Sequence, residues 1–184
     1  LSLALAAEAT FVARTVDVDV QHLVGTLQKA AAHKGSAFVE IYQNCVIFND
    51  DVYKYATDKA VKADNLLYLE HGKPMIFGKD KSKGIRLNGL KPEVVTVGKD
   101  CQVDDILTHD EASDDPTLAY LLSRFAHDPR NPGSFPEPVG VFRSVRKPTY
   151  EEQLDARIKT ATEKKGPGQI ADLFKAEDVW TVSG

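Results

Sequence analysis

Residues 9–42 read ATFVARTVDVDVQHLVGTLQKAAAHKGSAFVEIY, and this stretch decides the fold. It opens with a short β-prone run at residues 9–14, and nearly continuous β-formers return at residues 37–42. Between these two runs, apolar residues recur at the spacing of one helical face, at Val20, Leu23, Leu27, Ala30 and Ala31. The stretch therefore predicts a strand, a helix and a second, parallel strand, and its length is typical of a βαβ unit.

The residues at the ends of the helix and in the second strand extend this prediction. Asp17 and Asp19 offer side chains that can cap the start of the helix. A nearly continuous run of β-formers after an amphipathic helix is typical of a parallel strand that is covered on both faces. We therefore expect Phe38, Val39 and Ile41 to be buried beneath helices, in an α/β fold with a parallel sheet.

The middle of the chain predicts additions to this core. A weakly amphipathic helix is expected at residues 52–61. From residue 66 to residue 97, short β runs alternate with Gly-containing turns, among them Asn88-Gly89. Closely spaced strands of this kind indicate a small antiparallel β appendage at residues 66–97.

Helical segments are expected at both ends of the chain. Residues 1–9 form an Ala/Leu-rich run without an initiator methionine, which we interpret as a helix inside a larger protein. Thr149 and Glu152 make a capping box that opens a mostly polar helix. The expected organisation is one domain at residues 1–145 and a helical tail at residues 146–184. As a fragment, the chain is expected to be stable only with the rest of its subunit or with partner chains.

Composition excludes several classes of protein. The chain has 184 residues, of which 42% are hydrophobic and 27% charged, so it is neither disordered nor collagen-like. Its net charge of −4 argues against nucleic-acid binding, and no apolar run is long enough to span a membrane. Two cysteines and no glycosylation sequon give no sign of secretion. We expect a soluble, cytoplasmic protein.

Most generic catalytic motifs are absent from the sequence. It has no phosphate-binding glycine loop, no nucleophile elbow and no zinc-protease motif. His109-Asp110 is compatible with a general base held by its neighbour, but a partly buried structural pair is the favoured interpretation. Most of the sequence therefore gives no indication of catalysis.

The loop that follows the second strand is different. In open α/β sheets, ligands bind beyond the carboxyl ends of the strands, and residues 43–50 are expected there. The loop contains a soft ligand, Cys45, together with the amides of Asn44 and Asn49. On spacing alone, a buried and inert thiol at Cys45 is the favoured alternative.

A family resemblance favours the ligand interpretation. Residues 2–14, 38–50 and 71–78 resemble the beta subunit of 2-oxoacid:ferredoxin oxidoreductases, and the similarity extends over roughly residues 1–145. The residue pattern of these stretches looks more like that of the 2-oxoglutarate-type enzymes than that of the pyruvate-type enzymes. The resemblance implies that this part of the chain is the C-terminal half of a thiamine diphosphate-binding domain, and the helical tail lies outside the resemblance.

The same resemblance implies a reaction, cofactors and partners. Enzymes of this family oxidatively decarboxylate a 2-oxoacid on thiamine diphosphate with Mg²⁺, release an acyl-CoA, and pass electrons through a [4Fe–4S] cluster to ferredoxin. Coenzyme A and the 2-oxoacid are the substrates, and an alpha or fused gamma-alpha subunit is the partner. The family's diphosphate motif and paired cysteines are not in this sequence and are expected upstream of Leu1, so this chain is not expected to be active alone.

Carried onto this sequence, the resemblance predicts that Cys45 is the fourth ligand of the [4Fe–4S] cluster. Asn44 and Asn49 are expected near the cluster and the diphosphate, where they donate hydrogen bonds or shape the loop. Cys101 matches no family motif and is expected to be an ordinary thiol.

Two alternatives stay open at this point. The first alternative is a non-catalytic assembly or docking module with a thiamine-enzyme-like fold. The second is part of another thiamine-fold decarboxylase that has no iron–sulfur centre.

Overall fold

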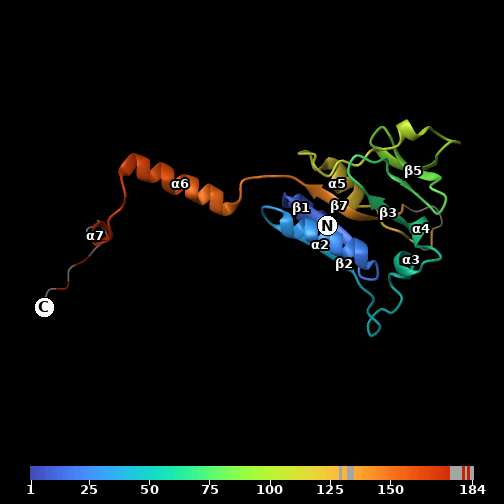
Figure 1. The fold of residues 1–184 in the computed structure, drawn as a ribbon, viewed down its shortest axis with the longest axis horizontal. Helices are drawn as coiled ribbons and strands as arrows, with labels where there is room; N and C mark the ends of the chain where they lie inside the picture. Colours follow the sequence, from blue (N-terminus) through green and yellow to red (C-terminus); the bar gives the residue numbers. More distant parts are fainter. Residues whose placement is uncertain (129, 132–134, 175–179, 181, 183–184) are drawn as a thin grey trace. The chain divides into compact units, whose positions relative to one another are not determined.

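The structure is a computed structural model, and it describes residues 1–128, 130–131, 135–174, 180 and 182. The chain divides into two compact units, Leu1–Lys147 and Pro148–Gly184 (Figure 1). The first unit contains two β-sheets and the helices packed on them, whereas the described part of the second unit contains only helices. The predicted mixture of strands and helices with parallel pairing is confirmed.

The main sheet has four strands in the order β2-β1-β7-β3. These strands are β1 (Phe11–Val16), β2 (Ala37–Tyr42), β3 (Leu66–Leu69) and β7 (Glu137–Ser144). β1 is parallel to β2, and β3 is parallel to β7, but β7 pairs antiparallel with β1. The sheet is therefore mixed, which the sequence did not predict. As a result, the carboxyl ends of β1 and β2 lie at the same end of the sheet as the first residues of β7 and β3.

The predicted strand–helix–strand unit is confirmed, with α2 (Val20–Ala32) between β1 and β2. The helix begins after Asp19, whose carboxylate accepts a hydrogen bond from the backbone N–H of His22 at 3.4 Å. α2 covers one face of the sheet (Figure 1). The side chains in this layer are Phe11, Ala13, Val141, Ala30 and Val39.

The expected burial of Phe38, Val39 and Ile41 is wrong. Phe38 is 41% exposed and Ile41 is 43% exposed, while Val39 is only half-buried beside α2. The physical reason is the position of β2 at the edge of the sheet, where among the described residues it pairs with β1 alone. A run of β-formers does not distinguish an edge strand from a central strand, because that difference depends on which strands lie on either side.

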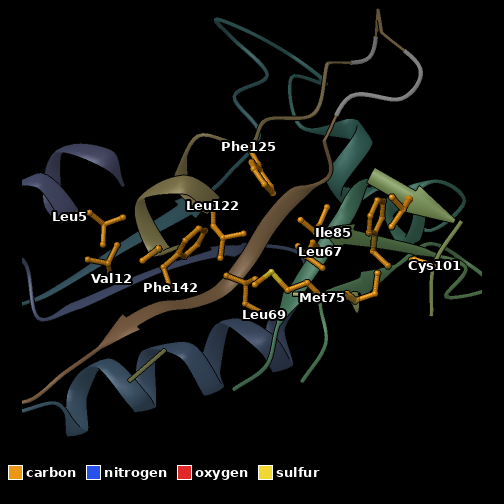
Figure 2. Close-up of a cluster of buried hydrophobic side chains, with 14 residues drawn as sticks. Leu5, Val12, Leu67, Leu69, Met75, Ile85, Cys101, Leu122, Phe125 and Phe142 are labelled. Carbon is orange, nitrogen blue, oxygen red and sulfur yellow. The ribbon is translucent and has the colours of Figure 1, made fainter. Parts of the chain in front are cut away.

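The opposite face of the sheet is covered by α1 (Ser2–Ala6) and α5 (Thr117–Ser123), which confirms the helix expected at the amino terminus. Figure 2 shows Leu5 and Leu122 packed over Val12 and Phe142. The same cluster continues from the main sheet into the second sheet, through Leu67, Leu69, Met75, Phe77, Ile85, Val95, Cys101 and Ile106. One apolar core therefore joins both sheets.

The second sheet is the predicted antiparallel appendage, with β4 (Ile76–Phe77), β5 (Lys83–Asn88) and β6 (Lys91–Thr96) in sequence order. The turn between β5 and β6 contains Gly89 at φ +61°, a left-handed conformation that suits glycine. β3 was expected in this appendage but belongs to the main sheet, where it pairs with β7. Its partner lies about seventy residues further along the chain, so local spacing could not reveal the pairing.

The prediction of a single helix at residues 52–61 is wrong. The structure has two short helices instead, α3 (Lys54–Thr57) and α4 (Lys62–Asn65). Between them, the carboxylate of Asp58 accepts a hydrogen bond from the backbone N–H of Ala60 at 2.8 Å. A short acidic side chain that bonds the backbone in this way competes with helix continuation.

The second unit contains α6 (Tyr150–Lys165) and α7 (Ile170–Leu173), and the rest of the expected tail at 175–179, 181 and 183–184 lies outside the described residues. The capping box at Thr149 and Glu152 is confirmed. In the described ranges, no helix combines the length and the apolar character that crossing a membrane requires.

Candidate functional site

The loop that begins after β2 carries Cys45 at the carboxyl end of the parallel pair β1 and β2. The Cys45 thiol is exposed, so the burial assumed by the alternative interpretation is wrong. The loop turns back on itself where the backbone N–H of Asn49 donates to the carbonyl of Cys45 at 2.9 Å. The thiol is thereby presented to solvent beside the end of the sheet.

The backbone of this turn changes the acidity of the thiol. N–H groups of Phe48 and Ile47, and then of Asn49, donate toward the sulfur and lower the pKa of Cys45 below its usual value. The thiolate is the form of cysteine that attacks electrophiles and binds metal ions. The turn therefore favours the reactive form of Cys45.

The two asparagines of the loop have different contacts. The Asn44 side chain donates to the Asp50 carboxylate at 2.9 Å and accepts from the backbone N–H of Asp51 at 3.0 Å. Asn44 therefore shapes the loop, as expected. Asn49 contributes its backbone N–H to the turn at Cys45. The predicted hydrogen bonds from these residues to a cluster or a diphosphate stay predictions.

The other cysteine lies in a different environment. Cys101 is 8% exposed and belongs to the apolar core that joins the two sheets (Figure 2). Both cysteines are free thiols. The structure is consistent with an ordinary buried thiol at Cys101.

A buried carboxylate lies at the same end of the sheet as the Cys45 loop. Glu137, the first residue of β7, is 2% exposed. One of its oxygens accepts from the Arg14 guanidinium and from the Tyr42 hydroxyl at 2.9 Å. The other oxygen accepts from the Tyr55 hydroxyl at 3.3 Å and from the backbone N–H of His127 at 3.2 Å. Both carboxylate oxygens of Glu137 therefore accept hydrogen bonds.

The buried charge of Glu137 and the hydroxyls of Tyr42 and Tyr55 stabilise one another. Arg14 is also buried, and its Nε donates to the Glu40 carboxylate at 2.6 Å. Burial, and then the nearby charge of Glu137, raise the pKa of Tyr42 and of Tyr55 well above the usual tyrosine value. Both tyrosines therefore stay neutral donors to Glu137.

Sequence reasoning did not find this cluster of Arg14, Tyr42, Tyr55 and Glu137. One signal was available, because Arg14 lies in a strand that is otherwise mostly apolar, and a buried arginine requires an anionic partner. The identity of that partner depended on the antiparallel pairing of β7, which the sequence did not predict.

The pair His109-Asp110 is not an acid–base site. His109 is 1% exposed, and its Nε2–H donates to the carbonyl of Val141 at 2.7 Å. Asp110 instead lies 3.4 Å from Nδ1 of His71. The structural interpretation of His109 is confirmed, but its partner is the backbone of β7 and not Asp110.

The described residues contain no group of three or more His, Cys, Asp or Glu side chains that could hold a metal ion. Within the described ranges, Cys45 therefore belongs to no such group and offers one thiol ligand. An exposed thiol that favours the thiolate can act chemically as a nucleophile, or as one ligand of a metal centre completed by other residues.

Comparison with known proteins identifies similar curated subunits. No protein-family model matches the chain. The chain is 35% identical over 184 residues to 2-oxoglutarate oxidoreductase subunit KorB of Mycobacterium tuberculosis, in an alignment that covers 99% of this chain and 48% of that relative. It spans about half the length of this curated relative.

Shorter matches agree with this result. Over 61 residues, 33% of this chain and 20% of the relative, it is 41% identical to the 2-oxoacid:ferredoxin oxidoreductase subunit beta of Saccharolobus solfataricus. Over 50 residues, 27% of this chain and 16% of the relative, it is 46% identical to subunit beta of 2-oxoacid:ferredoxin oxidoreductase 1 of Aeropyrum pernix. The recognition made from the residues is confirmed, because the chain is similar over its whole length to one such curated subunit and over shorter stretches to beta subunits of 2-oxoacid:ferredoxin oxidoreductases.

Proposed function

We propose that this chain is the C-terminal part of the beta subunit of a 2-oxoacid:ferredoxin oxidoreductase, and that Cys45 is a ligand of its [4Fe–4S] cluster. The observation that carries the proposal is the exposed Cys45 thiol, whose pKa is lowered by the backbone of its own turn. A cluster is held by thiolates, and hydrogen bonds to its sulfurs tune its potential. Homology with beta subunits of this family supports the same role.

The proposed substrate is 2-oxoglutarate. Support comes from the name of the M. tuberculosis relative, because its alignment covers nearly the whole of this chain. The archaeal relatives are named only for 2-oxoacids. In the proposed reaction the 2-oxoacid loses CO₂, coenzyme A receives the acyl group, and two electrons pass singly to ferredoxin. Thiamine diphosphate supplies the carbanion chemistry of decarboxylation when it is bound.

The residues of this chain fit only one part of that cofactor set. Cys45 fits as a single cluster ligand, whereas the described residues contain no side-chain group that could hold a metal ion by itself. In this proposal, the other cluster ligands and the sites for diphosphate and Mg²⁺ come from residues outside the described ranges. The proposal therefore includes an alpha or gamma-alpha partner subunit, and a catalytic site to which this chain contributes a part.

An activity assay tests the proposal. The protein, purified with the subunits that accompany it, is expected to reduce ferredoxin when it receives both 2-oxoglutarate and coenzyme A. Cys45→Ser is expected to abolish ferredoxin reduction, because a serine hydroxyl is a poor cluster ligand. Cys101→Ser is the matched control, and it is expected to keep the electron transfer.

Two results would contradict the proposal. Full ferredoxin reduction by the Cys45→Ser protein would exclude an essential role of this thiol. If the wild-type protein bound its partner subunits but failed to oxidise any 2-oxoacid, the alternative of a docking module would be supported instead.

A further inference from the structure

We propose that Tyr42, Tyr53 and Tyr55 form a clamp, anchored on Glu137, that fixes the geometry of the Cys45 loop. In this proposal they are positioning residues for electron transfer. The redox part of the inference rests on the proposed cluster at Cys45. The mechanical part concerns this chain alone and is tested separately.

The first observation is an aromatic contact that closes the loop. Tyr42 is the last residue of β2, and Tyr53 lies just before α3. Their rings stack with centroids 4.1 Å apart and planes inclined by 14°. The chain entering the loop and the chain leaving it are therefore held together at residues 42 and 53, with Cys45 between them.

The second observation is that both sides of the loop are tied to one buried charge. On the entering side, the Tyr42 hydroxyl donates to Glu137 at 2.9 Å. On the leaving side, the Tyr55 hydroxyl donates to the other oxygen of the same carboxylate at 3.3 Å. Because Glu137 is the first residue of the inner strand β7 and is ion-paired with Arg14 of β1, the base of the loop is tied to the two inner strands of the main sheet.

The third observation concerns the Tyr42 ring. The guanidinium carbon of Arg14 lies 4.8 Å from the centroid of this ring. The ring is thus contacted by both Tyr53 and Arg14, while its hydroxyl is bonded to Glu137. Such contacts leave Tyr42 few alternative rotamers, so the direction in which the chain leaves β2 is determined.

The tip of the loop has no comparable support. Val46, Ile47 and Phe48 are between 72% and 89% exposed, so within the described residues they pack little against the fold. The turn around Cys45 is held by local hydrogen bonds, and its orientation relative to the sheet depends on the base. The position of the Cys45 sulfur and of the N–H groups around it therefore depends on the clamp.

This dependence has a consequence for a cluster bound at Cys45. The potential of an iron–sulfur cluster depends on hydrogen bonds to its sulfurs and on its exposure to solvent. Loosening the clamp changes both, although every group that touches the cluster is still present. Tyr53 and Tyr42 are therefore expected to influence the potential without being ligands.

Hydrogen exchange measured by mass spectrometry tests the mechanical part on the protein purified with its accompanying subunits. Tyr53→Leu removes the stacked ring and is expected to raise amide exchange in residues 43–52 by about fivefold, the effect of losing an aromatic pair. Tyr53→Phe keeps the ring and is expected to restore slow exchange. Tyr68→Phe is a remote control, because that hydroxyl donates to Asp19 and not to Glu137.

Redox titration followed by electron paramagnetic resonance (EPR) tests the positioning part on the same proteins. The cluster potential and the EPR line shape are expected to shift in Tyr53→Leu and to return to wild-type values in Tyr53→Phe, with iron content unchanged throughout. Unchanged exchange of the loop in Tyr53→Leu would overturn the clamp. Faster exchange with an unchanged potential and line shape would overturn the positioning role.

Failure of the proposed function gives a different pattern. A wild-type protein without any cluster would remove the positioning role together with the proposed function. The exchange experiment would still decide whether the clamp holds the loop, because that measurement needs no iron.

Discussion

Replacing Glu137 by glutamine is expected to destabilise the main sheet strongly, because it removes a buried charge and keeps its volume. Arg14 is 6% exposed and would lose one of its two carboxylates, while its contact with Glu40 at 2.6 Å remains. Removing one partner of a buried pair costs several kcal/mol, since the other charge stays buried. With Glu40 still present, we expect the free energy of unfolding to fall by about 3 kcal/mol, a small value for the loss of one partner from a buried pair.

The amide of the glutamine adds to this loss. Two hydroxyls, of Tyr42 and Tyr55, and the backbone N–H of His127 donate to the carboxylate of Glu137. An amide accepts through its oxygen only, so its NH₂ group must face some of these donors. Glu137→Gln therefore leaves donors without an acceptor in a buried site, where each unpaired group is costly.

Hydrogen exchange of β1 and β7 measures the effect in the assembled protein. A loss of about 3 kcal/mol corresponds to roughly 150-fold faster exchange where these strands exchange by opening. The matched control is Glu93→Gln, because the Arg86–Glu93 pair is about one-third exposed and such pairs contribute about 1 kcal/mol or less. The reasoning would be refuted if exchange in Glu137→Gln rose less than about fivefold, as in the control.

Further predictions concern two glycines and a histidine. Gly140→Ala is expected to destabilise the fold by more than about 2 kcal/mol in thermal or urea unfolding, because its φ is +125° and a Cβ would lie 2.7 Å from the carbonyl oxygen of Leu69. Gly25→Ala, in α2 with open space around the new methyl, is expected to stabilise by about 0.5–1 kcal/mol, and a loss of stability would contradict this. Burial lowers the pKa of His109 below 6.5, so the unfolded chain binds a proton first as the pH falls. Stability is therefore expected to decrease as the pH falls below about 6.5, and His109→Gln, which does not titrate, is expected to flatten this pH dependence.

Elements whose signals are local were predictable from the sequence. The strand–helix–strand unit follows from the change between strand and helix periodicity within residues 9–42, and both strands and the helix were found. The capping box at Thr149 and the turn at Asn88-Gly89 each depend on a few adjacent residues, and both are present. These predictions succeeded because the interactions involved lie close together in the sequence.

Pairings between distant segments were not predictable. β7 lies between β1 and β3 in the sheet, although more than sixty residues separate it from either strand in the sequence. This arrangement moved β3 out of the appendage and left β2 at the edge, where Phe38 is exposed. Strand order is a property of the whole chain, so hydrophobic runs alone do not determine it.

The candidate site was likewise predictable where its signal is local and not where it depends on the pairing of distant strands. Cys45 was identified from its place after a strand and from the family motif, and it lies in an exposed loop at that place. Its exposure went against the general tendency of cysteine to be buried. Glu137 was missed because its partner Arg14 comes next to it only through the antiparallel pairing of β1 with β7, and Tyr42 only through the further pairing of β2 with β1.

Iron content together with low-temperature EPR of the reduced protein tests the central claim that Cys45 is a cluster ligand. We expect wild-type protein and Cys101→Ser to contain a complete [4Fe–4S] cluster, and Cys45→Ser to lose iron and the EPR signal while keeping its fold, as judged by circular dichroism. A complete cluster with an unchanged signal in Cys45→Ser, or a cluster that is lost only in Cys101→Ser, would contradict the claim.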